Sequence, residues 1–178
     1  MSKQIKVKSR NEIATNKVFR LYFDAIEDEE NNIKEDNYLV IERHSSLEEY
    51  TGVSVLPMVG DSVLLINVYR HAIQKKIFEV PRGFIENDDK NLKSSALREL
   101  REETDFDCRN INMIFMPGMY PEPGILRAKV ALFIAKNCFK IEKNINKNKY
   151  LGHKSYKLFS RSDIKKMIQT PENFDTTT

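Results

Sequence analysis

Hydrophobic and polar positions divide the chain into short segments of β-type composition and two segments of helical composition. β-branched and aromatic residues are dense, and turn residues punctuate, in the predicted strands, which cover residues 17–25, 38–42, 52–58, 62–69, 77–80, 111–116, 130–135 and 156–159. Gly60 and Asp61 favour a hairpin turn, so the strands on either side of them are expected to run antiparallel. The N-terminal part of the chain is therefore predicted to be rich in strands.

Two segments are predicted to be helices. Residues 92–103 lack Gly and Pro and are rich in Leu, Ala, Arg and Glu, which are strong helix formers. Ser160 is a suitable cap for a second helix that carries Asp163 in its first turn and extends to about residue 168. Residues 139–156 are rich in Lys and Asn and are expected to form a solvated loop. Strands flanked by a few helices predict a mixed α/β sandwich.

The composition is that of a globular chain. With 178 residues, of which 40% are hydrophobic and 31% charged, it suits one folded domain plus an appendage. The formal net charge is only +3, and Lys is interleaved with Asp and Glu, so a nucleic-acid partner is not expected. The polar start lacks the apolar core of a signal peptide, and no apolar run is long enough to span a bilayer, so we expect a cytoplasmic protein with no membrane partner. Cys108 and Cys138 lack metal-site spacing, so reduced thiols are expected.

Three carboxylates share one face of the first predicted helix. At about 100° per residue, Glu99, Glu102 and Glu103 occupy a common arc, where they repel one another unless a cation lies among them. Arg98 reaches Glu102 at i+4, which leaves Glu99 and Glu103 as the pair most in need of positive charge. Carboxylate oxygens with no His or Cys nearby suit Mg²⁺ or Mn²⁺ rather than zinc. From this helix alone, a metal site and an ordinary solvated helix face both stay open.

The segment from Gly83 to Phe106 resembles the Nudix box, written G-x5-E-x7-R-E-U-x-E-E-x-G-U with U an aliphatic residue. Gly83 matches the first glycine of this motif. Residues 98–103, RELREE, match R-E-U-x-E-E throughout, and Phe106 takes the closing apolar position. This half of the motif is specific because it fixes four charged residues and an apolar one at set spacing.

The resemblance extends outside the box to ADP-ribose pyrophosphatases and related nucleotide-sugar hydrolases. Residues 78–83 look like their E-x-P-x-G strand end, residues 68–70 like their Q-Y-R strand, and residues 120–124 like their Y-P-x-P-G loop. This implies a Nudix-type α/β/α sandwich with a mixed sheet and an N-terminal β-rich extension. In these relatives the extension packs against a partner subunit. Residues 1–50 are therefore predicted to be a dimer-forming extension, and residues 51–178 the Nudix domain.

The implied activity is metal-dependent hydrolysis of the pyrophosphate linkage of ADP-ribose or another nucleoside diphosphate sugar. Divalent cations suit this chemistry because they neutralise phosphate oxygens and both position and acidify water. The resemblance implies Mg²⁺, with Mn²⁺ as an alternative, held by Glu99 and Glu103 as principal ligands, Glu102 as an auxiliary one, and the carbonyl of Arg82.

The resemblance also implies roles for residues that do not hold metal. Arg98 would orient Glu102, and Glu103 would be essential for turnover. Arg70 matches a substrate-contacting arginine, whose guanidinium suits phosphate, although a surface ion pair is an equally good interpretation. Tyr120 and Pro121 would border the base or the terminal ribose.

The chain departs from the family pattern at three places. One residue more than the box allows precedes its arginine, and Asp89 or Lys90 stands at the position of its first Glu. Asp105 replaces the second glycine, although Asp tolerates a left-handed conformation better than most residues. The loop that carries a catalytic glutamate in relatives aligns on residues 150–154, which contain no carboxylate.

The general base is therefore predicted to be Glu102, on the metal-binding face, or Glu142, with Glu102 favoured and His153 as the next candidate. Two other functions stay open. One is a Nudix enzyme that acts on RNA 5′ ends or nucleoside triphosphates, and the other is a non-catalytic Nudix domain that binds a nucleotide. The base and the sugar of the substrate are left open, because the loops that contact them vary within the family.

Overall fold

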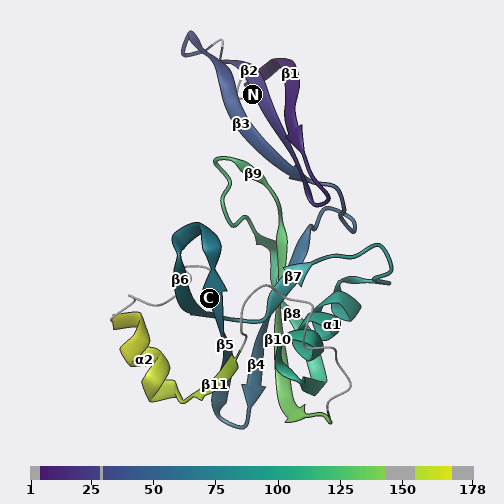
Figure 1. The fold of residues 1–178 in the computed structure, drawn as a ribbon, viewed down its shortest axis with the longest axis vertical. Coiled ribbons are helices and arrows are strands. Elements are labelled where there is room, and N and C mark those ends of the chain that lie inside the picture. The colour runs from purple at the N-terminus through teal and green to yellow at the C-terminus, as the bar shows by residue number, and fades with distance from the viewer. Residues whose placement is uncertain (1–4, 29, 143–154, 170–178) are drawn as a thin grey trace.

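The computed structural model describes residues 5–28, 30–142 and 155–169. Its strands form two sheets, one of four strands and one of seven. Figure 1 shows the four-stranded sheet standing above a body that contains the seven-stranded sheet and both α-helices. This arrangement agrees with the predicted α/β class.

The four-stranded sheet, here called the N-terminal sheet, has the order β1-β2-β3-β9. Its strands are β1 (Lys6–Thr15), β2 (Phe19–Asp28), β3 (Ile33–Arg43) and β9 (Leu126–Arg127). The first three run antiparallel to one another, whereas β9 joins β3 in parallel. Arg10 ties these strands together by donating to Asp24 at 2.8 and 2.7 Å and to Glu42 at 2.6 Å. Because β9 comes from the second half of the chain, this sheet is not built from residues 1–50 alone, and a domain boundary at residue 50 stays a prediction.

The seven-stranded sheet has the main order β11-β5-β4-β10-β8, with β6 beside β5 and β7 beside β4. Its strands are β4 (Gly52–Val59), β5 (Ser62–Arg70), β6 (Lys75–Glu79), β7 (Arg82–Phe84), β8 (Phe106–Met119), β10 (Val130–Lys140) and β11 (Ser155–Phe159). The helices are α1 (Leu92–Thr104), α2 (Arg161–Gln169) and the short 3-10 helix η1 (His71–Ile73). Strands β4 and β10 are parallel and the other pairs antiparallel, so the sheet is mixed, as predicted. The predicted hairpin is present, with Gly60 at a φ of 56° in its turn.

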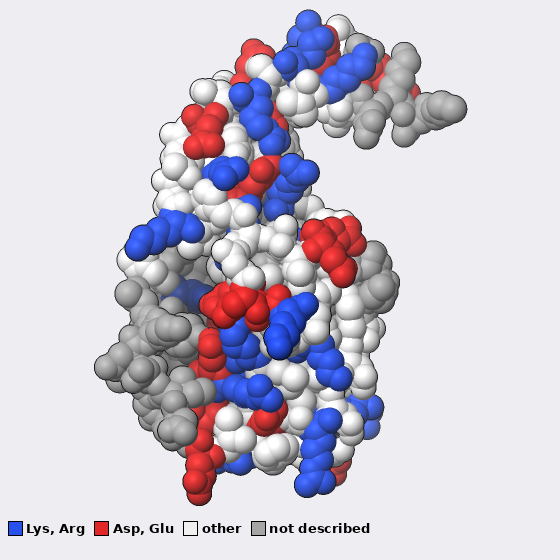
Figure 2. Space-filling model, turned by 90° about the vertical axis from the view of Figure 1, so that its right-hand side faces the viewer, with Lys and Arg blue, Asp and Glu red and all other residues white. Residues whose placement is uncertain are grey.

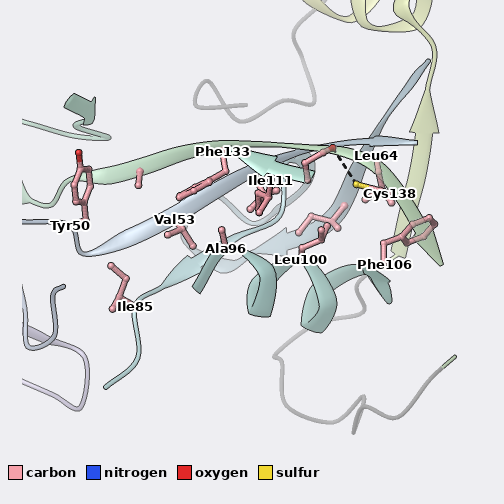
Figure 3. Close-up of a cluster of buried hydrophobic side chains, with 14 of the residues drawn as sticks. Tyr50, Val53, Leu64, Ile85, Ala96, Leu100, Phe106, Ile111, Phe133 and Cys138 are labelled. Atoms are coloured by element: carbon pink, nitrogen blue, oxygen red, sulfur yellow. Dashed lines mark hydrogen bonds between the residues drawn. The ribbon is translucent and has the colours of Figure 1, made fainter. Parts of the chain in front are cut away.

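Hydrophobic side chains pack on both faces of this sheet. Because successive residues of a strand point to opposite faces, Leu64 and Ile66 of β5 join one buried cluster, whereas Leu65 joins another. Helix α1 covers the larger cluster through Leu100, as Figure 3 shows. Helix α2 covers the smaller cluster through Met167. Each such buried aliphatic side chain stabilises the fold by roughly 1.5–3 kcal/mol, and the result is an α/β/α layering.

The structure differs from the sequence-based prediction at several strands. Strand β1 is not predicted by the pattern, because all of its residues are exposed and main-chain pairing with β2, rather than burial, holds it. Strand β8 begins at Phe106 rather than at residue 111, and β10 continues to Lys140, so the predicted loop 139–156 is wrong at its start. The reason is that antiparallel pairing of β8 with β10 continues to Lys140 opposite Phe106. Residues 143–154 of that predicted loop, His153 among them, lie outside the described residues. Among the described residues, no helix has the length and apolar character needed to cross a membrane.

Candidate active site

Helix α1, which carries the three carboxylates, is capped at its start by side chains and at its end by the backbone of Asp105. At its start the Asn91 side chain accepts from the Ser94 N–H at 2.9 Å, and the Ser94 hydroxyl accepts from the Asn91 N–H at 3.0 Å. This reciprocal pair satisfies main-chain donors that a helix leaves without partners. At its end Asp105 adopts a left-handed conformation with φ 62° and ψ 27°. The residue that replaces the second glycine of the box therefore still ends the helix, as expected.

The Glu99 carboxyl group lies in a space that exists because residue 83 has no side chain. A Cβ atom built on Gly83 would lie 2.2 Å from the carboxyl carbon of Glu99 and 2.2 and 2.3 Å from its two oxygens. Glu99 is only 5% exposed. Burial raises the pKa of Glu99 to about 7, against the lowering effect of Arg98 and with the negative charge of Glu103 adding to the rise. A cation bound beside such a carboxyl group would favour its charged form and so lower its pKa.

Arg98, on α1, binds the loop that precedes this helix. Its guanidinium donates to both oxygens of Asp89 at 3.1 and 2.9 Å, and to the Phe84 carbonyl at 2.9 Å. It also donates to Glu99 at 2.8 Å and to Glu102 at 3.4 Å. Burial raises the pKa of Asp89, but the hydrogen bonds from Arg98 outweigh it and hold that pKa below its usual value.

Of the two residues that stand at the Glu position of the box, Asp89 is the one whose side chain is shown to contact Arg98. Asp89 forms a two-pronged, charge-assisted pair with Arg98, the strong geometry for a guanidinium and a carboxylate. Its side chain is 5% exposed. The loop before α1 has one residue more than the box allows, and Asp89, whose side chain is shorter than that of Glu, holds it to Arg98. The predicted contact of Arg98 with Glu102 is present, although it is the longest of the hydrogen bonds that Arg98 makes.

Glu103 contacts the chain just before Gly83. Its Oε2 accepts from the main-chain N–H of Arg82 at 2.9 Å. The resemblance implies that the carbonyl of Arg82, rather than this N–H, contacts a metal, and that role stays a prediction. Glu99 and Glu103, two of the predicted metal ligands, both lie beside the start of β7.

The donor set fits a divalent cation bound by few protein groups. Among the described residues, no three His, Cys, Asp or Glu side chains converge as a ready cage for a metal ion. Mg²⁺ characteristically uses one or two carboxylates and completes its shell with water and substrate phosphates. The buried Glu99 and the neighbouring Glu103 supply such a pair of carboxylates. A side chain at position 83 would occupy the space of the Glu99 carboxyl group.

Arg70 makes an ion pair, as one of its two interpretations expects, but the partner is buried. Arg70 Nη2 contacts Oε1 of Glu79, a residue that is fully buried, and Arg82 Nη2 lies 2.8 Å from Oε2 of the same carboxylate. The side chains of Arg70 and Arg82 keep 41% and 30% of their surface exposed. Two partly exposed guanidinium groups are thus held together on one buried carboxylate.

A cavity of about 850 Å³ lies between the N-terminal sheet and the loop that follows β8. Its lining includes Tyr38 and Arg43 from β3, Arg127 from β9, and Tyr120 and Lys129 from the segments on either side of β9. Tyr120, which is predicted to border the substrate, lines this cavity, whose volume is in the range of ligand sites. Its role in binding stays a prediction. Pro121, its predicted companion, is not among the described lining residues.

Arg43 connects this cavity with the loop of the Nudix-like motif. Its guanidinium stacks over the Phe84 ring at 3.8 Å and donates to the Ile85 carbonyl at 3.3 Å. Its Nε is buried and has no hydrogen-bond acceptor among the described residues. Burial lowers the pKa of Arg43, and the negative charges of Glu86 and Glu99 oppose that change. The sequence gives no sign of this residue's position, because the contact joins the end of β3 to a loop about forty residues later.

Lys129 fixes the other wall of the cavity. This lysine is 6% exposed, and its ammonium contacts the Glu49 carboxylate. The ammonium also lies 4.9 Å from the centre of the Tyr50 ring and 5.9 Å from that of Tyr120. Hydrogen bonding to Glu49 raises the pKa of Lys129, so the ammonium is held in its charged form. Lys129 thereby ties the Tyr120 loop to the segment that leads into β4.

The two candidate bases occupy different surroundings. The side chain of Glu102 is 24% exposed and lies on the same helix face as Glu99 and Glu103, in contact with Arg98. Glu142 is exposed and follows Ile141, whose N–H donates to the Asp105 carbonyl at 3.0 Å. Glu142 therefore lies near the C-terminal end of α1, and neither residue's role as the base is tested by these positions.

Charged side chains of both signs are interspersed on the face of the molecule that Figure 2 shows. Blue and red groups lie there over both the N-terminal sheet and the body. This distribution is consistent with the small formal net charge of +3.

Comparison with known proteins gives the family. The family model described as NUDIX domain matches residues 49–175, which include the carboxylate helix, β7 and the cavity loop. The chain belongs to the Nudix family. The resemblance of residues 83–106 to the Nudix box is thereby confirmed. The site residues inferred from it stay predictions.

Among the proteins that this Nudix protein resembles are a bacterial activator protein and a hydrolase of known structure. A methanol dehydrogenase activator from Bacillus methanolicus is 29% identical over 91 residues, which cover 51% of this chain and 48% of the relative, so the chain spans about half the length of that protein. A crystal structure of an ADP compounds hydrolase superposes with a TM-score of 0.72 over 96% of this chain and 86% of the other, at 15% identity. At that identity the likeness concerns the fold, and it confirms the predicted Nudix-type α/β fold.

Proposed function

We propose that this Nudix protein hydrolyses the pyrophosphate linkage of a nucleoside diphosphate joined to a sugar, with ADP-ribose as the first candidate and Mg²⁺ as the cofactor. The observation that carries the proposal is the packing of the Glu99 carboxyl group on Gly83, with Glu103 beside it on the Arg82 N–H. A buried carboxylate with a second one nearby favours a divalent metal site over the other interpretation of this helix, an ordinary solvated face. The ADP compounds hydrolase named above supports a nucleotide derivative as the substrate class.

Glu99 and Glu103 are assigned to hold the cation, with Glu102 as an auxiliary ligand. When bound, a divalent cation supplies neutralisation of phosphate oxygens and acidification of water. Arg98 acts through position: its contacts with Asp89 and the Phe84 carbonyl fix the loop, and its contacts with the helix fix two of the carboxylates. Misplacement of such groups by about 1 Å lowers rates by about a hundredfold, so this network matters for turnover.

The general base is assigned to Glu102 rather than to Glu142. Glu102 shares the helix face with Glu99 and Glu103, so it would lie near a water that is bound to a cation held by those two carboxylates. A weak base suffices when the water is already acidified. Glu142 is exposed near the end of the helix, among residues with no described link to the carboxylate face.

The nucleoside or sugar half of the substrate is assigned to the cavity of about 850 Å³. Tyr120 offers an aromatic face for a base or ribose. Arg43 lies between this cavity and the Phe84–Ile85 loop, where it contributes positive charge toward Glu99. A substrate with its diphosphate at the carboxylates and one end in the cavity would therefore pass Arg43.

We further propose that the chain is a homodimer in which the N-terminal sheet contacts the partner subunit. Large apolar side chains are exposed on that sheet, and they include Val7, Ile13, Phe23 and Ile33. Light scattering at micromolar concentration tests the assignment, which a fully active monomer would contradict.

The test of the activity is a substrate panel of ADP-ribose, GDP-mannose, UDP-glucose, a dinucleoside polyphosphate, a nucleoside triphosphate and a capped RNA. Each is assayed with Mg²⁺, with Mn²⁺ and with a chelator. We expect hydrolysis of at least one nucleoside diphosphate sugar, abolished by the chelator. Preference for triphosphate or RNA would favour the alternative Nudix enzyme, and nucleotide binding without turnover would identify a non-catalytic domain.

A further inference from the structure

Cys108 and Cys138 lie directly opposite each other on two neighbouring strands. Cys108 is near the start of β8 and Cys138 near the end of β10, and the antiparallel register pairs one with the other. They are the two cysteines of the chain, and both are free thiols in the structure. Their spacing in the sequence does not predict this pairing, because residues 109–137 separate them.

The position of this pair along the two strands brings the main chains close together. The N–H of Ile141 donates to the carbonyl of Asp105 at 3.0 Å, and the register from Lys140 to Cys138 follows without a shift. Because hydrogen-bonded and non-hydrogen-bonded pairs alternate along antiparallel strands, Cys138 and Cys108 form a non-hydrogen-bonded pair. At such a pair the Cα atoms lie about 4.5 Å apart, which is within the range of about 4.4–6.8 Å that disulfide bonds usually show.

The two thiols differ in their access to solvent. Cys138 packs in the hydrophobic cluster beneath α1 (Figure 3), whereas Cys108 lies at the edge of that cluster and is half-buried. Burial raises the pKa of both thiols, to about 11 for Cys138, and the neighbouring Cys108 adds to the rise at Cys138. A small oxidant in solution would therefore meet Cys108 first, with the second thiol held behind it.

We propose that Cys108 and Cys138 are a redox site, at which a peroxide converts the two thiols into a disulfide bond that joins β8 to β10 within the folded chain. This inference does not rest on the proposed function. It concerns a covalent change of the sheet on which the carboxylate helix packs, and it uses none of the residues assigned to the metal or the substrate.

The reaction has two steps. In the first, the Cys108 sulfur attacks the peroxide, the O–O bond breaks, and one water leaves while a sulfenic acid forms on Cys108. In the second, the Cys138 sulfur attacks the Cys108 sulfur, an S–S bond forms, and the S–O bond breaks with release of a second water. The two sulfur atoms lose two electrons, the peroxide gains them, and the thiol protons end in water. Because the thiolate is the reactive form and both pKa values are raised, we expect this oxidation to be slow.

The disulfide bond would close residues 109–137 into a loop. That loop carries one wall of the cavity, including Tyr120, Arg127 and Lys129. A link across a loop of about thirty residues restricts the unfolded chain and so stabilises the folded one, provided that the native strands accommodate the bond. The non-hydrogen-bonded pairing of the two cysteines meets that condition.

The test treats the full chain, first reduced with dithiothreitol and freed of it, with hydrogen peroxide and then blocks the remaining thiols with iodoacetamide. Intact mass spectrometry counts the blocked thiols, and a digest without reductant shows which cysteines are joined. Denaturing gel electrophoresis without reductant separates a link within one chain from a link between chains. Thermal melting compares the oxidised protein with the reduced protein.

Three variants accompany the wild type. Cys108→Ser and Cys138→Ala each remove one thiol of the pair. The matched control combines Cys108→Ser with Arg109→Cys, so that one accessible and one buried thiol remain. Successive side chains of a strand point to opposite faces, so the thiol at position 109 should point away from Cys138.

We expect the oxidised wild type to retain no thiol that iodoacetamide can block, and to yield one peptide pair that joins Cys108 to Cys138. It should melt about 5 °C or more above the reduced protein, and dithiothreitol should restore both thiols. Cys138→Ala should instead accumulate a sulfenic acid on Cys108, which dimedone traps. In Cys108→Ser the buried Cys138 should stay reduced, and the matched control should form no link within one chain.

Several results would overturn the redox site. They are two thiols that iodoacetamide still blocks after peroxide, a sulfinic acid on Cys108 beside a free Cys138, and links between chains only. A link within the chain of the matched control would show that the register does not matter. An oxidised wild type that melts no higher than the reduced protein would show that the bond does not fit the native strands. Each of these readouts is independent of hydrolysis, so the proposed function is tested separately.

Discussion

Replacement of Gly83 by alanine tests whether the position of the Glu99 carboxyl group matters. The new Cβ would meet the carboxyl group at 2.2 Å, whereas ordinary contacts of a Cβ begin at 3.4 Å, so the carboxyl group must retreat by roughly 1 Å. Glu99 has little room to do so, because it is 5% exposed and bonded to Arg98 at 2.8 Å. Forcing a methyl group into such a packed place costs about 1–3 kcal/mol.

The effect on turnover should exceed the effect on folding. Displacement of a reacting group by about 1 Å lowers the rate by about a hundredfold, so we expect a folded protein with kcat/KM reduced by that order. The free energy of unfolding is measured by urea denaturation, and turnover is measured on the best substrate of the panel with saturating Mg²⁺.

Two control variants isolate the contact. Gly60→Ala introduces a methyl group at a φ of +56° with no atom within 4 Å, so it should cost about 1–2 kcal/mol of strain without lowering turnover. In a Glu99→Ala background the clash is gone, so the stability cost of Gly83→Ala should fall to within about 0.5 kcal/mol of zero. Wild-type turnover in Gly83→Ala, or the full stability cost without Glu99, would refute the reasoning.

Four further predictions follow from the same geometry. Glu103→Gln should keep the fold and lower kcat at least about a hundredfold, because several kcal/mol of charge stabilisation depend on the cation; near-normal kcat would remove Glu103 from the site. Asp105→Gly should raise the free energy of unfolding by up to about 1 kcal/mol in urea denaturation, because Asp105 has a φ of 62°; a decrease would show that its side chain matters more than its conformation. Asp89→Asn should lower the free energy of unfolding by about 1.5–3 kcal/mol through its hydrogen bonds to Arg98, and unchanged melting would contradict that role. Glu102→Gln should lower kcat with little change in KM, whereas Glu142→Gln should not; the reverse result would assign the base to Glu142, and metal affinity measured alongside separates a base from a ligand.

Local sequence patterns were sufficient to predict the elements that bury a regular face. Strand β4 and helix α1 lie within a residue of their predicted bounds, because apolar residues recur at the strand and helix periods there. Ser160 caps α2 as predicted, with its hydroxyl accepting from the Asp163 N–H at 3.2 Å. Strand β1 buries none of its residues, so no hydrophobic period marks it. Strand β9 has two residues and depends on its pairing with β3.

The site was predictable to the extent that its residues lie close in sequence. Glu99, Glu102 and Glu103 follow from helix geometry, and their resemblance to the Nudix box supplies the chemistry. The contact of Glu79 with Arg70 and the position of Arg43 are different. The first depends on the pairing of β5 with β6, and the second on the approach of β3 to the Phe84 loop. Contacts of that kind are set by tertiary packing, which no local pattern encodes.

Product analysis of the best substrate in isotopically labelled water tests the central claim most directly. With ADP-ribose and Mg²⁺, hydrolysis of the pyrophosphate linkage predicts AMP and ribose phosphate in equal amounts, with heavy oxygen from water in one of the two phosphates. Glu103→Gln should form both products at least about a hundredfold more slowly. Release of inorganic phosphate, formation of ADP with free ribose, or equal product formation by Glu103→Gln would contradict the account.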